Sequence, residues 1–173
     1  DKTSELDTYY QTDVLVTGFD IIFFWVARMM MMGLHFMGEV PFRTVYLHPM
    51  VRDEKGQKMS KTKGNVIDPL VITEQYGADA LRFTLAALTA QGRDIKLAKE
   101  RIEGYRAFAN KLWNATRFAL MNLDGFEGGG VEAGAARTAA DRWILARTQR
   151  AVNETVAALE AFRFNEAAGT VYH

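Results

Sequence analysis

The chain has 173 residues, of which 49% are hydrophobic and 24% charged, and its 21 acidic and 21 basic side chains give a formal net charge of zero. This composition is that of an ordinary globular protein, long enough for a sizeable core, and it excludes wholesale disorder. Cysteine is absent, which excludes disulfides and thiolate metal sites. His35, His48 and His173 show no ligand spacing, so we expect no protein-bound metal.

The longest apolar run, residues 21–32, is interrupted by Arg28, and by this count it is too short to span a bilayer. No signal peptide opens the chain, so we expect a cytoplasmic protein without membrane contact. The sequence begins at Asp1 without a methionine and ends at His173 inside an expected helix. We therefore expect it to be a piece of a longer protein.

Strands and helices alternate in the first half of the chain. Residues 13–18 are a β-branched run that ends at Gly18, apolar residues then repeat at helical spacing over 21–32, and residues 44–48 form a second strand candidate. In that helix we interpret Trp25 and the methionines as packing residues. This order predicts an open α/β sheet, in which ligands bind beyond the strand ends.

Helices dominate the rest of the sequence. Asp68 and Pro69 open a helix that Gly77 divides into two short ones. A long amphipathic helix then follows polar residues 91–94. The face that we expect to pack carries Ile102, Tyr105, Ala109, Leu112, Trp113, Thr116 and Leu120. The other face has an excess of basic residues, which suits RNA or, equally well, an ordinary charged surface.

A glycine- and alanine-rich stretch, residues 124–140, follows this helix, and its composition predicts a flexible connection. We expect Asp141 to cap the last helix, whose apolar residues extend to Phe162. Two long amphipathic helices joined in this way predict the beginning of a helical bundle. The predicted fold class is therefore α/β followed by all-α.

Residues 58–63, Lys-Met-Ser-Lys-Thr-Lys, are the stretch that indicates a chemistry, and we call them the lysine loop. Its lysines alternate with small or flexible residues, so their ammonium groups can follow negative charge that develops during a reaction. Lys58 and Lys61 are the natural pair for a nucleoside triphosphate. Removing one such donor costs on the order of 3 kcal/mol of transition-state stabilisation. The sequence contains no P-loop or dinucleotide-binding fingerprint, and a solvated lysine turn is the alternative.

Gly18 and Asp20 follow the first strand, at the edge where such sheets bind ligands. A glycine there lets a ligand approach the backbone, and the Asp20 carboxylate can accept hydrogen bonds from ribose hydroxyls. Asp20 is therefore our candidate for sugar recognition, with capping of the following helix as the alternative.

Residues 58–62 resemble the KMSKS signature of the class I aminoacyl-tRNA synthetases, with Thr62 in place of the final serine. The change keeps a hydroxyl group. Four longer stretches are similar to the valyl branch of this family in bacteria, namely residues 16–29, 53–61, 64–69 and 76–83. The resemblance is good over residues 9–123 and looser beyond them.

The resemblance implies that valine and ATP, with Mg²⁺ accompanying the ATP, react to valyl-adenylate and pyrophosphate, and that the valyl group then passes to tRNA(Val). Lys58 and Lys61 would be catalytic, holding the triphosphate as pyrophosphate leaves. Met59 would meet the adenine, Asp20 the ribose, and Ile21 would line the amino-acid pocket. The complete enzyme would be a monomer. The implied ATP-binding set is Gly18, Asp20, Lys58, Met59, Ser60, Lys61 and Thr62.

The resemblance also divides the chain. Residues 1–92 would be the C-terminal part of a Rossmann-like catalytic domain, 93–123 the stem-contact region with the first bundle helix, 124–140 the connection, and 141–173 the truncated anticodon-binding bundle. The HIGH signature and the editing domain of the family do not occur in this sequence. We therefore expect that these 173 residues alone cannot form valyl-adenylate.

Two alternatives stay open. The isoleucyl and leucyl branches share the lysine loop, but the residues after Gly18, Phe-Asp-Ile-Ile-Phe-Phe-Trp, favour the valyl branch. The other alternative is a non-catalytic RNA-binding module, in which Lys61 has no part in ATP-linked chemistry and RNA binding depends steeply on salt.

Overall fold

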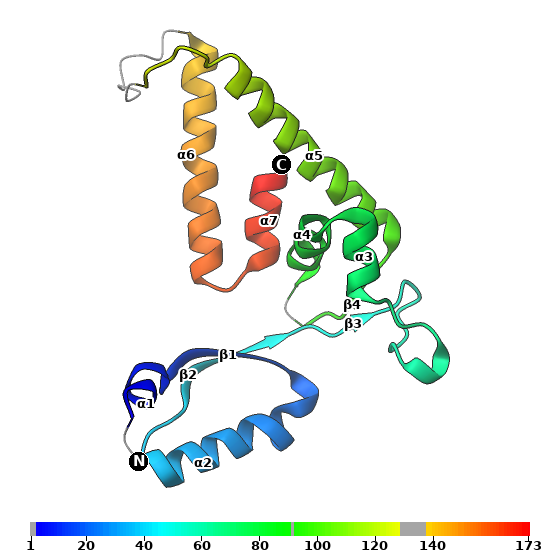
Figure 1. The fold of residues 1–173 in the computed structure, drawn as a ribbon, viewed down its shortest axis with the longest axis vertical. Coiled ribbons are helices and arrows are strands. Elements are labelled where there is room, and N and C mark those ends of the chain that lie inside the picture. Colours follow the sequence, from blue (N-terminus) through cyan, green and yellow to red (C-terminus); the bar gives the residue numbers. More distant parts are fainter. Residues whose placement is uncertain (1–2, 91, 129–137) are drawn as a thin grey trace. The chain divides into compact units, whose positions relative to one another are not determined.

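The computed structural model describes residues 3–90, 92–128 and 138–173. By its internal contacts the chain divides into two compact units, Asp1–Met50 with Gln91–Asp94, and Val51–Ala90 with Ile95–His173. In chain order, the elements labelled in Figure 1 and the short helical turns between them are α1 (Ser4–Tyr9), β1 (Thr12–Gly18), η1 (Phe19–Ile21), η2 (Ile22–Val26), α2 (Ala27–Met37), β2 (Phe42–His48), β3 (Val51–Arg52), η3 (Lys61–Lys63), α3 (Pro69–Tyr76), α4 (Ala78–Leu88), β4 (Ile95–Lys96), α5 (Lys99–Met121), α6 (Ala139–Glu160) and α7 (Phe164–Tyr172).

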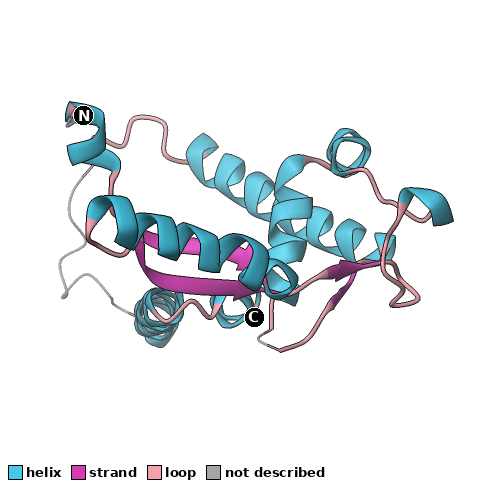
Figure 2. Cartoon of the chain, turned by 90° about the horizontal axis from the view of Figure 1, so that it is seen from below, coloured by secondary structure: helices cyan, strands magenta, loops and turns pink. Residues whose placement is uncertain are grey.

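The first unit is a strand–helix–strand arrangement. Its two strands, β1 and β2, pair in parallel, from Thr12 opposite Phe42 to Gly18 opposite His48. Parallel neighbours need a crossover connection, and the helical segment between them supplies it. In Figure 2, α2 passes in front of the two strands. Both predicted strands are confirmed and begin one or two residues earlier than expected, whereas α1 was not predicted.

The crossover is a continuous helical segment that changes from a 3-10 turn through a π-helical turn to an α-helix. Over Phe19–Met37 it has 19 residues with a mean hydropathy of 1.4, which is long and apolar enough to cross a membrane. The sequence-based statement that this segment is too short to span a bilayer was therefore wrong, because it counted only the apolar run at residues 21–32 and not the whole helical segment. The packing assignment was wrong as well, since Trp25 and Met31 are 55% and 62% exposed.

Two short helices form the centre of the second unit, as predicted. Asp68 is the N-cap of α3 and accepts a hydrogen bond from Leu70 N at 2.9 Å, with Pro69 in the first turn. Gly77, with φ +90°, separates α3 from α4, a conformation that favours glycine. The buried core of the unit consists of Ile72, Ala80, Leu97 and Ile102.

The strands of the second unit, β3 and β4, also pair in parallel, with Val51 opposite Ile95 and Arg52 opposite Lys96. This pairing places the segment before the lysine loop beside the segment before α5. The predicted α/β arrangement is therefore present, but the strands of the described residues form two separate pairs instead of one sheet.

Aromatic side chains join α4, α5 and α7. The ring centroids of Phe83 and Tyr105 lie 5.0 Å apart, those of Phe83 and Phe108 5.3 Å, and those of Phe108 and Tyr172 4.9 Å. Figure 1 shows α7 beside α6, against which it also packs. The C-terminal helices therefore share a core with the helices that follow the lysine loop.

Two expectations for the long helices need correction. In α5, Ile102 is fully buried, but Trp113 and Leu120 are 73% and 64% exposed. The ring contacts that α4 and α7 make with α5 are at Tyr105 and Phe108, in the first half of the helix. In α6, the N-cap is Thr138, three residues before the predicted cap, and Asp141 completes a capping box from inside the helix. Of the predicted connection, residues 129–137 lie outside the described residues.

Candidate functional site

The lysine loop follows a tight turn at the end of β3. Gly56 N donates to Asp53 O at 2.9 Å, with Gly56 at φ +79°, and Gln57 N donates to Asp53 Oδ1 at 2.7 Å. The chain then returns so that Lys58 forms an antiparallel bridge with Arg52. An aspartate that accepts bonds from the backbone just ahead of it is typical of such turns. The turn fixes where the lysine loop begins.

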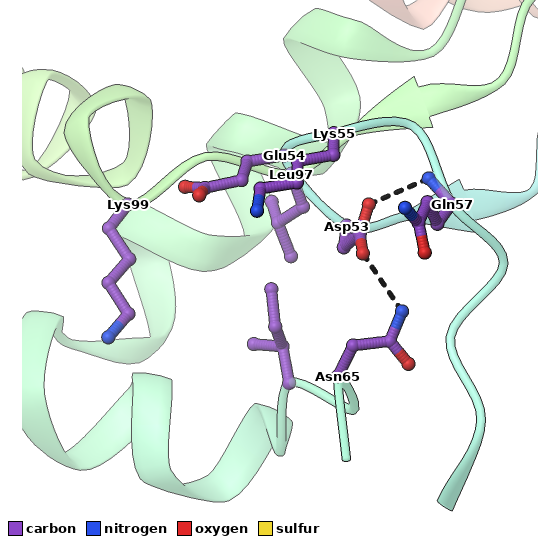
Figure 3. A pocket seen from close by; sticks show the side chains of 8 residues that line it. Asp53, Glu54, Lys55, Gln57, Asn65, Leu97 and Lys99 are labelled. Atoms are coloured by element: carbon purple, nitrogen blue, oxygen red, sulfur yellow. Dashed lines mark hydrogen bonds between the residues drawn. The ribbon is translucent and has the colours of Figure 1, made fainter. Parts of the chain in front are cut away.

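Asn65 ties the loop together from its other end. Its Oδ1 accepts a hydrogen bond from Ser60 N at 2.9 Å, and its Nδ2 donates to Lys58 O at 3.3 Å and to Asp53 Oδ2 at 2.8 Å. The bonds from Asp53 to Gln57 and to Asn65 are drawn in Figure 3. One half-buried side chain therefore holds the backbone on both sides of Met59.

Ser60 and a glycine shape the middle of the loop. Lys63 N donates to Ser60 Oγ at 3.3 Å, which caps the single turn η3, and Gly64 ends that turn at φ +67°. The sulfur of Met59 accepts a hydrogen bond from Ile67 N at 3.4 Å, so the half-buried Met59 side chain lies against the segment that leads to α3. The loop therefore has a defined backbone, although it contains little regular structure.

The lysine side chains themselves project into solvent. Lys58, Lys61 and Lys63 are exposed, and none of them forms an ion pair with a carboxylate of the described residues. By contrast, both oxygens of the Asp53 carboxylate accept hydrogen bonds. The amide of Asn65, the backbone N–H of Gln57 and the nearby Lys55 lower the pKa of Asp53, while burial opposes the shift. An ionised acceptor therefore organises a loop whose ammonium groups remain available to an anion.

A cavity of about 480 Å³ lies on the Asp53 side of this network (Figure 3). Its lining residues are Asp53, Glu54, Lys55, Gln57, Asn65, Ile67, Leu97 and Lys99. Lys58 and Lys61 do not line it. The cavity shows that the hydrogen-bonded base of the loop is open to solvent, whereas the lysine side chains lie elsewhere on the loop.

The predicted residues of the first unit gather at the end of β1. Gly18 is buried, and a methyl group at that position would lie 2.7 Å from Asp20 Oδ1, a contact that must force a shift. Asp20 is exposed and lies in the turn η1, whose N-cap, Gly18, has no side-chain capping bond. The alternative role of Asp20 as a helix cap is therefore wrong. Ile21 is 41% exposed.

The structure brings the predicted residues together as two groups, one in each unit: Gly18, Asp20 and Ile21, and Lys58, Met59, Ser60, Lys61 and Thr62. Sequence reasoning gave Asn65 no role, and it placed Asp53 in the turn before the loop, as one of two acidic residues there, without a structural role in the loop itself. A sequence signal was present, because Asp and Asn commonly bond to nearby backbone and these two enclose the loop. Nothing in the spacing indicated that they bond to each other.

The model of the family described as tRNA synthetases class I (I, L, M and V) matches residues 1–98, more than half of the chain. The first unit and the lysine loop both fall within the match. This chain therefore belongs to the class I tRNA synthetases.

Among curated relatives, the chain is 68% identical to a valine–tRNA ligase of Geobacter sulfurreducens and 66% identical to one of Rhodopseudomonas palustris, each over 99% of the chain. It covers 20% and 18% of those proteins. The chain thus spans about a fifth of the length of the curated relatives that it matches.

A solved structure, the ternary LeuRS–tRNA–LeuAMS complex of Agrobacterium radiobacter K84, matches 92% of this chain with a TM-score of 0.81 and 27% identity. The match covers 21% of the LeuRS chain. The arrangement of elements described above is therefore that of a segment of a class I synthetase.

Proposed function

We propose that the complete protein containing this chain is a valine–tRNA ligase. In the first step, a carboxylate oxygen of valine attacks the α-phosphorus of ATP. The bond from that phosphorus to the oxygen bridging to the β-phosphate breaks, and pyrophosphate leaves with the bonding electrons. Valyl-adenylate remains. In the second step, a hydroxyl of the terminal ribose of tRNA attacks the valyl carbonyl and AMP leaves.

The lysine loop is the observation that carries this proposal. Negative charge grows on the pyrophosphate oxygens as the bond breaks, so cations that meet it there lower the barrier. Lys58 and Lys61 are exposed, and among the described residues they have no ion-pair partner to give up. We assign both to the triphosphate, and Ser60, Thr62 and the backbone around Met59 to the rest of the nucleotide.

The other assignments concern the first unit. We propose that Asp20 accepts hydrogen bonds from the ribose, that Gly18 leaves room for the ligand, and that Ile21 lines the valine pocket. The exposed Asp20 carboxylate, without a capping role, supports the first of these. We propose that Mg²⁺ accompanies the ATP phosphates; the described ranges contain no group of three His, Asp or Glu side chains that could hold a metal ion.

The relatives support valine as the amino acid. Valine–tRNA ligases are 61% to 68% identical to this chain, against 27% for the LeuRS structure. We place residues 1–92 in the C-terminal part of a Rossmann-like catalytic domain, 93–123 in the stem-contact region with the first helix of a tRNA-binding bundle, and 141–173 in the continuation of that bundle. The exposed basic residues of α5, among them Arg106 and Lys111, support contact with tRNA.

We further propose a monomeric, cytoplasmic enzyme. The family match includes Phe19–Met37, which supports an internal helix of the catalytic domain for this apolar segment instead of a membrane span.

Replacing Lys61 by alanine in the complete polypeptide tests the proposal. We expect valine-dependent exchange of pyrophosphate into ATP to slow by about two orders of magnitude, with tRNA binding nearly intact. Lys111→Ala is the matched control, because it removes an exposed cation of α5 and should leave exchange unchanged. Normal exchange in the Lys61 variant would remove the role of Lys61, and the absence of exchange in the unsubstituted polypeptide, with RNA binding that depends steeply on salt, would instead support the RNA-binding module.

A further inference from the structure

Asn65 connects more of the lysine loop than any one of the lysines does. Its carboxamide accepts from Ser60 N at 2.9 Å and donates to Lys58 O at 3.3 Å. These are backbone groups of the residues on either side of Met59. Because a carboxamide is flat and rigid, satisfying both groups at once fixes the spacing of the backbone between them.

The orientation of that carboxamide is itself set by a second residue. Nδ2 of Asn65 also donates to Asp53 Oδ2 at 2.8 Å, while Asp53 Oδ1 is taken up by Gln57 N at 2.7 Å. A carboxylate accepts and cannot donate, so it selects the orientation in which the amide nitrogen of Asn65 faces Asp53 and the amide oxygen faces Ser60. The bond between Asp53 and Asn65 is visible in Figure 3.

We propose that Asn65 is a positioning residue for the first reaction step. Its carboxamide, oriented by Asp53, fixes the backbone of the lysine loop so that the ammonium groups meet the triphosphate in the reactive arrangement. The inference rests on the proposed function, because it assigns that geometry to pyrophosphate release. Neither Asn65 nor Asp53 touches the reacting atoms in this scheme, so each acts through Lys58 and Lys61.

The position of these hydrogen bonds in the lysine loop determines which of the two reaction steps should slow when they are lost. Cations on flexible side chains bind a triphosphate from many conformations, but they stabilise the leaving pyrophosphate best from a narrow set. Loss of the hydrogen bonds of Asn65 should therefore lower kcat for adenylate formation more than it raises KM for ATP. The transfer step contains no triphosphate and should not change.

The experiment uses the complete polypeptide and three changes at this pair. Asn65→Ala removes every bond of the carboxamide. Asn65→Asp keeps the shape but removes both amide donor bonds and sets two carboxylates against each other. In the double variant Asp53→Asn with Asn65→Asp, the polarity is reversed: the new amide at position 53 can accept from Gln57 N and donate to the new carboxylate at position 65. That carboxylate can still accept from Ser60 N, but it cannot donate to Lys58 O, so we expect a partial recovery.

We expect Asn65→Ala and Asn65→Asp to lower kcat of valine-dependent pyrophosphate exchange roughly 10- to 100-fold, the size expected for losing bonds to a charged partner. The double variant Asp53→Asn with Asn65→Asp should recover at least half of the loss in kcat, measured on a logarithmic scale. Single-turnover transfer of valine from preformed valyl-adenylate to tRNA should stay within about twofold in all variants. Glu54→Gln is the matched control, since it removes one carboxylate next to Asp53 without a bond to the loop, and it should behave as wild type.

Three results would overturn the inference: unchanged pyrophosphate exchange in Asn65→Ala, loss of transfer in parallel with loss of pyrophosphate exchange, or no recovery of kcat in the double variant. The second would mean that Asn65 only keeps the domain folded. Lys61→Ala, measured alongside, separates the two proposals. If it slows exchange and the Asn65 variants do not, only the positioning role fails, whereas the absence of valine-dependent exchange in the unsubstituted polypeptide removes the proposed function itself.

Discussion

Asn65 donates a hydrogen bond from Nδ2 to Oδ2 of Asp53 at 2.8 Å, across twelve positions of the sequence. The whole lysine loop lies between these two residues. The exposed, unpaired lysines are therefore carried on a backbone that is closed at its base by a charge-assisted hydrogen bond, which is stronger than one between neutral groups.

The first prediction concerns acid pH. Because the folded state lowers the pKa of Asp53, its carboxylate contributes stability that is present above the ordinary aspartate pKa of about 3.9 and is lost as pH falls through the lower folded value. Hydrogen-exchange protection factors of the Gln57 and Ser60 amides should therefore decrease in that acid range. In Asp53→Asn the decrease should be absent, whereas Glu54→Gln should keep it. An equal acid response in wild type and Asp53→Asn would contradict the assignment.

The second prediction concerns the end of β1. Gly18→Ala places a methyl group 2.7 Å from Asp20 Oδ1, so the carboxylate must move. If Asp20 binds the ribose, KM for ATP in the complete enzyme should rise roughly tenfold, the value of one hydrogen bond to a charged group. Gly104→Ala is the control, because nothing lies within 4 Å of its added methyl group, and in a helix it should add about 0.5 to 1 kcal/mol of stability. An unchanged KM in Gly18→Ala would refute the ribose role.

The third prediction concerns the core of the second unit. Ile102 is 0% exposed among Ile72, Ala80 and Leu97, so Ile102→Ala should lower the free energy of unfolding by about 2 to 5 kcal/mol. Leu112 lies further along the same helix and is 48% exposed. Leu112→Ala should therefore lower the free energy of unfolding by less than about 1 kcal/mol. Urea unfolding of the 173-residue chain, followed by circular dichroism, compares the two. Equal losses would show that Ile72, Ala80 and Leu97 do not bury Ile102 in solution.

The fourth prediction concerns the 173 residues by themselves. They contain the lysine loop but no HIGH signature, which is the other ATP-binding signature that the resemblance implies. We expect valine-dependent pyrophosphate exchange by this chain to equal the buffer blank. Exchange above the blank that disappears in Lys61→Ala would contradict this expectation.

Local signals predicted most of the elements correctly. The strands around Thr12–Gly18 and Phe42–His48, the proline-started α3 and the break at Gly77 follow from β-branched runs, capping residues and glycine, which act over a few residues. Boundaries were less accurate. Thr138, not Asp141, caps α6, because a capping box contains two residues of the kind that can cap and the sequence alone does not tell which one stands outside the helix.

Burial could not be predicted in the same way. Trp25, Trp113 and Leu120 have the spacing of packing residues, yet all three are more than half exposed in the described structure. An apolar stripe shows that a face can be buried, but whether it is buried depends on which elements reach it. In α5, the ring contacts from α4 and α7 are at Tyr105 and Phe108, in the first half of the helix.

The sequence by itself determined the types and spacing of Lys58, Ser60 and Lys61, and the proposed role of the lysine loop at a triphosphate rests on these local properties. Tertiary structure decided how that loop is held. The bond between Asp53 and Asn65 depends on a turn at Gly56 that brings residues twelve positions apart into contact, and on the pairing of β3 with β4 that anchors the turn. Hydrogen bonds at such separations follow from the path of the chain in space, which residue types alone do not specify.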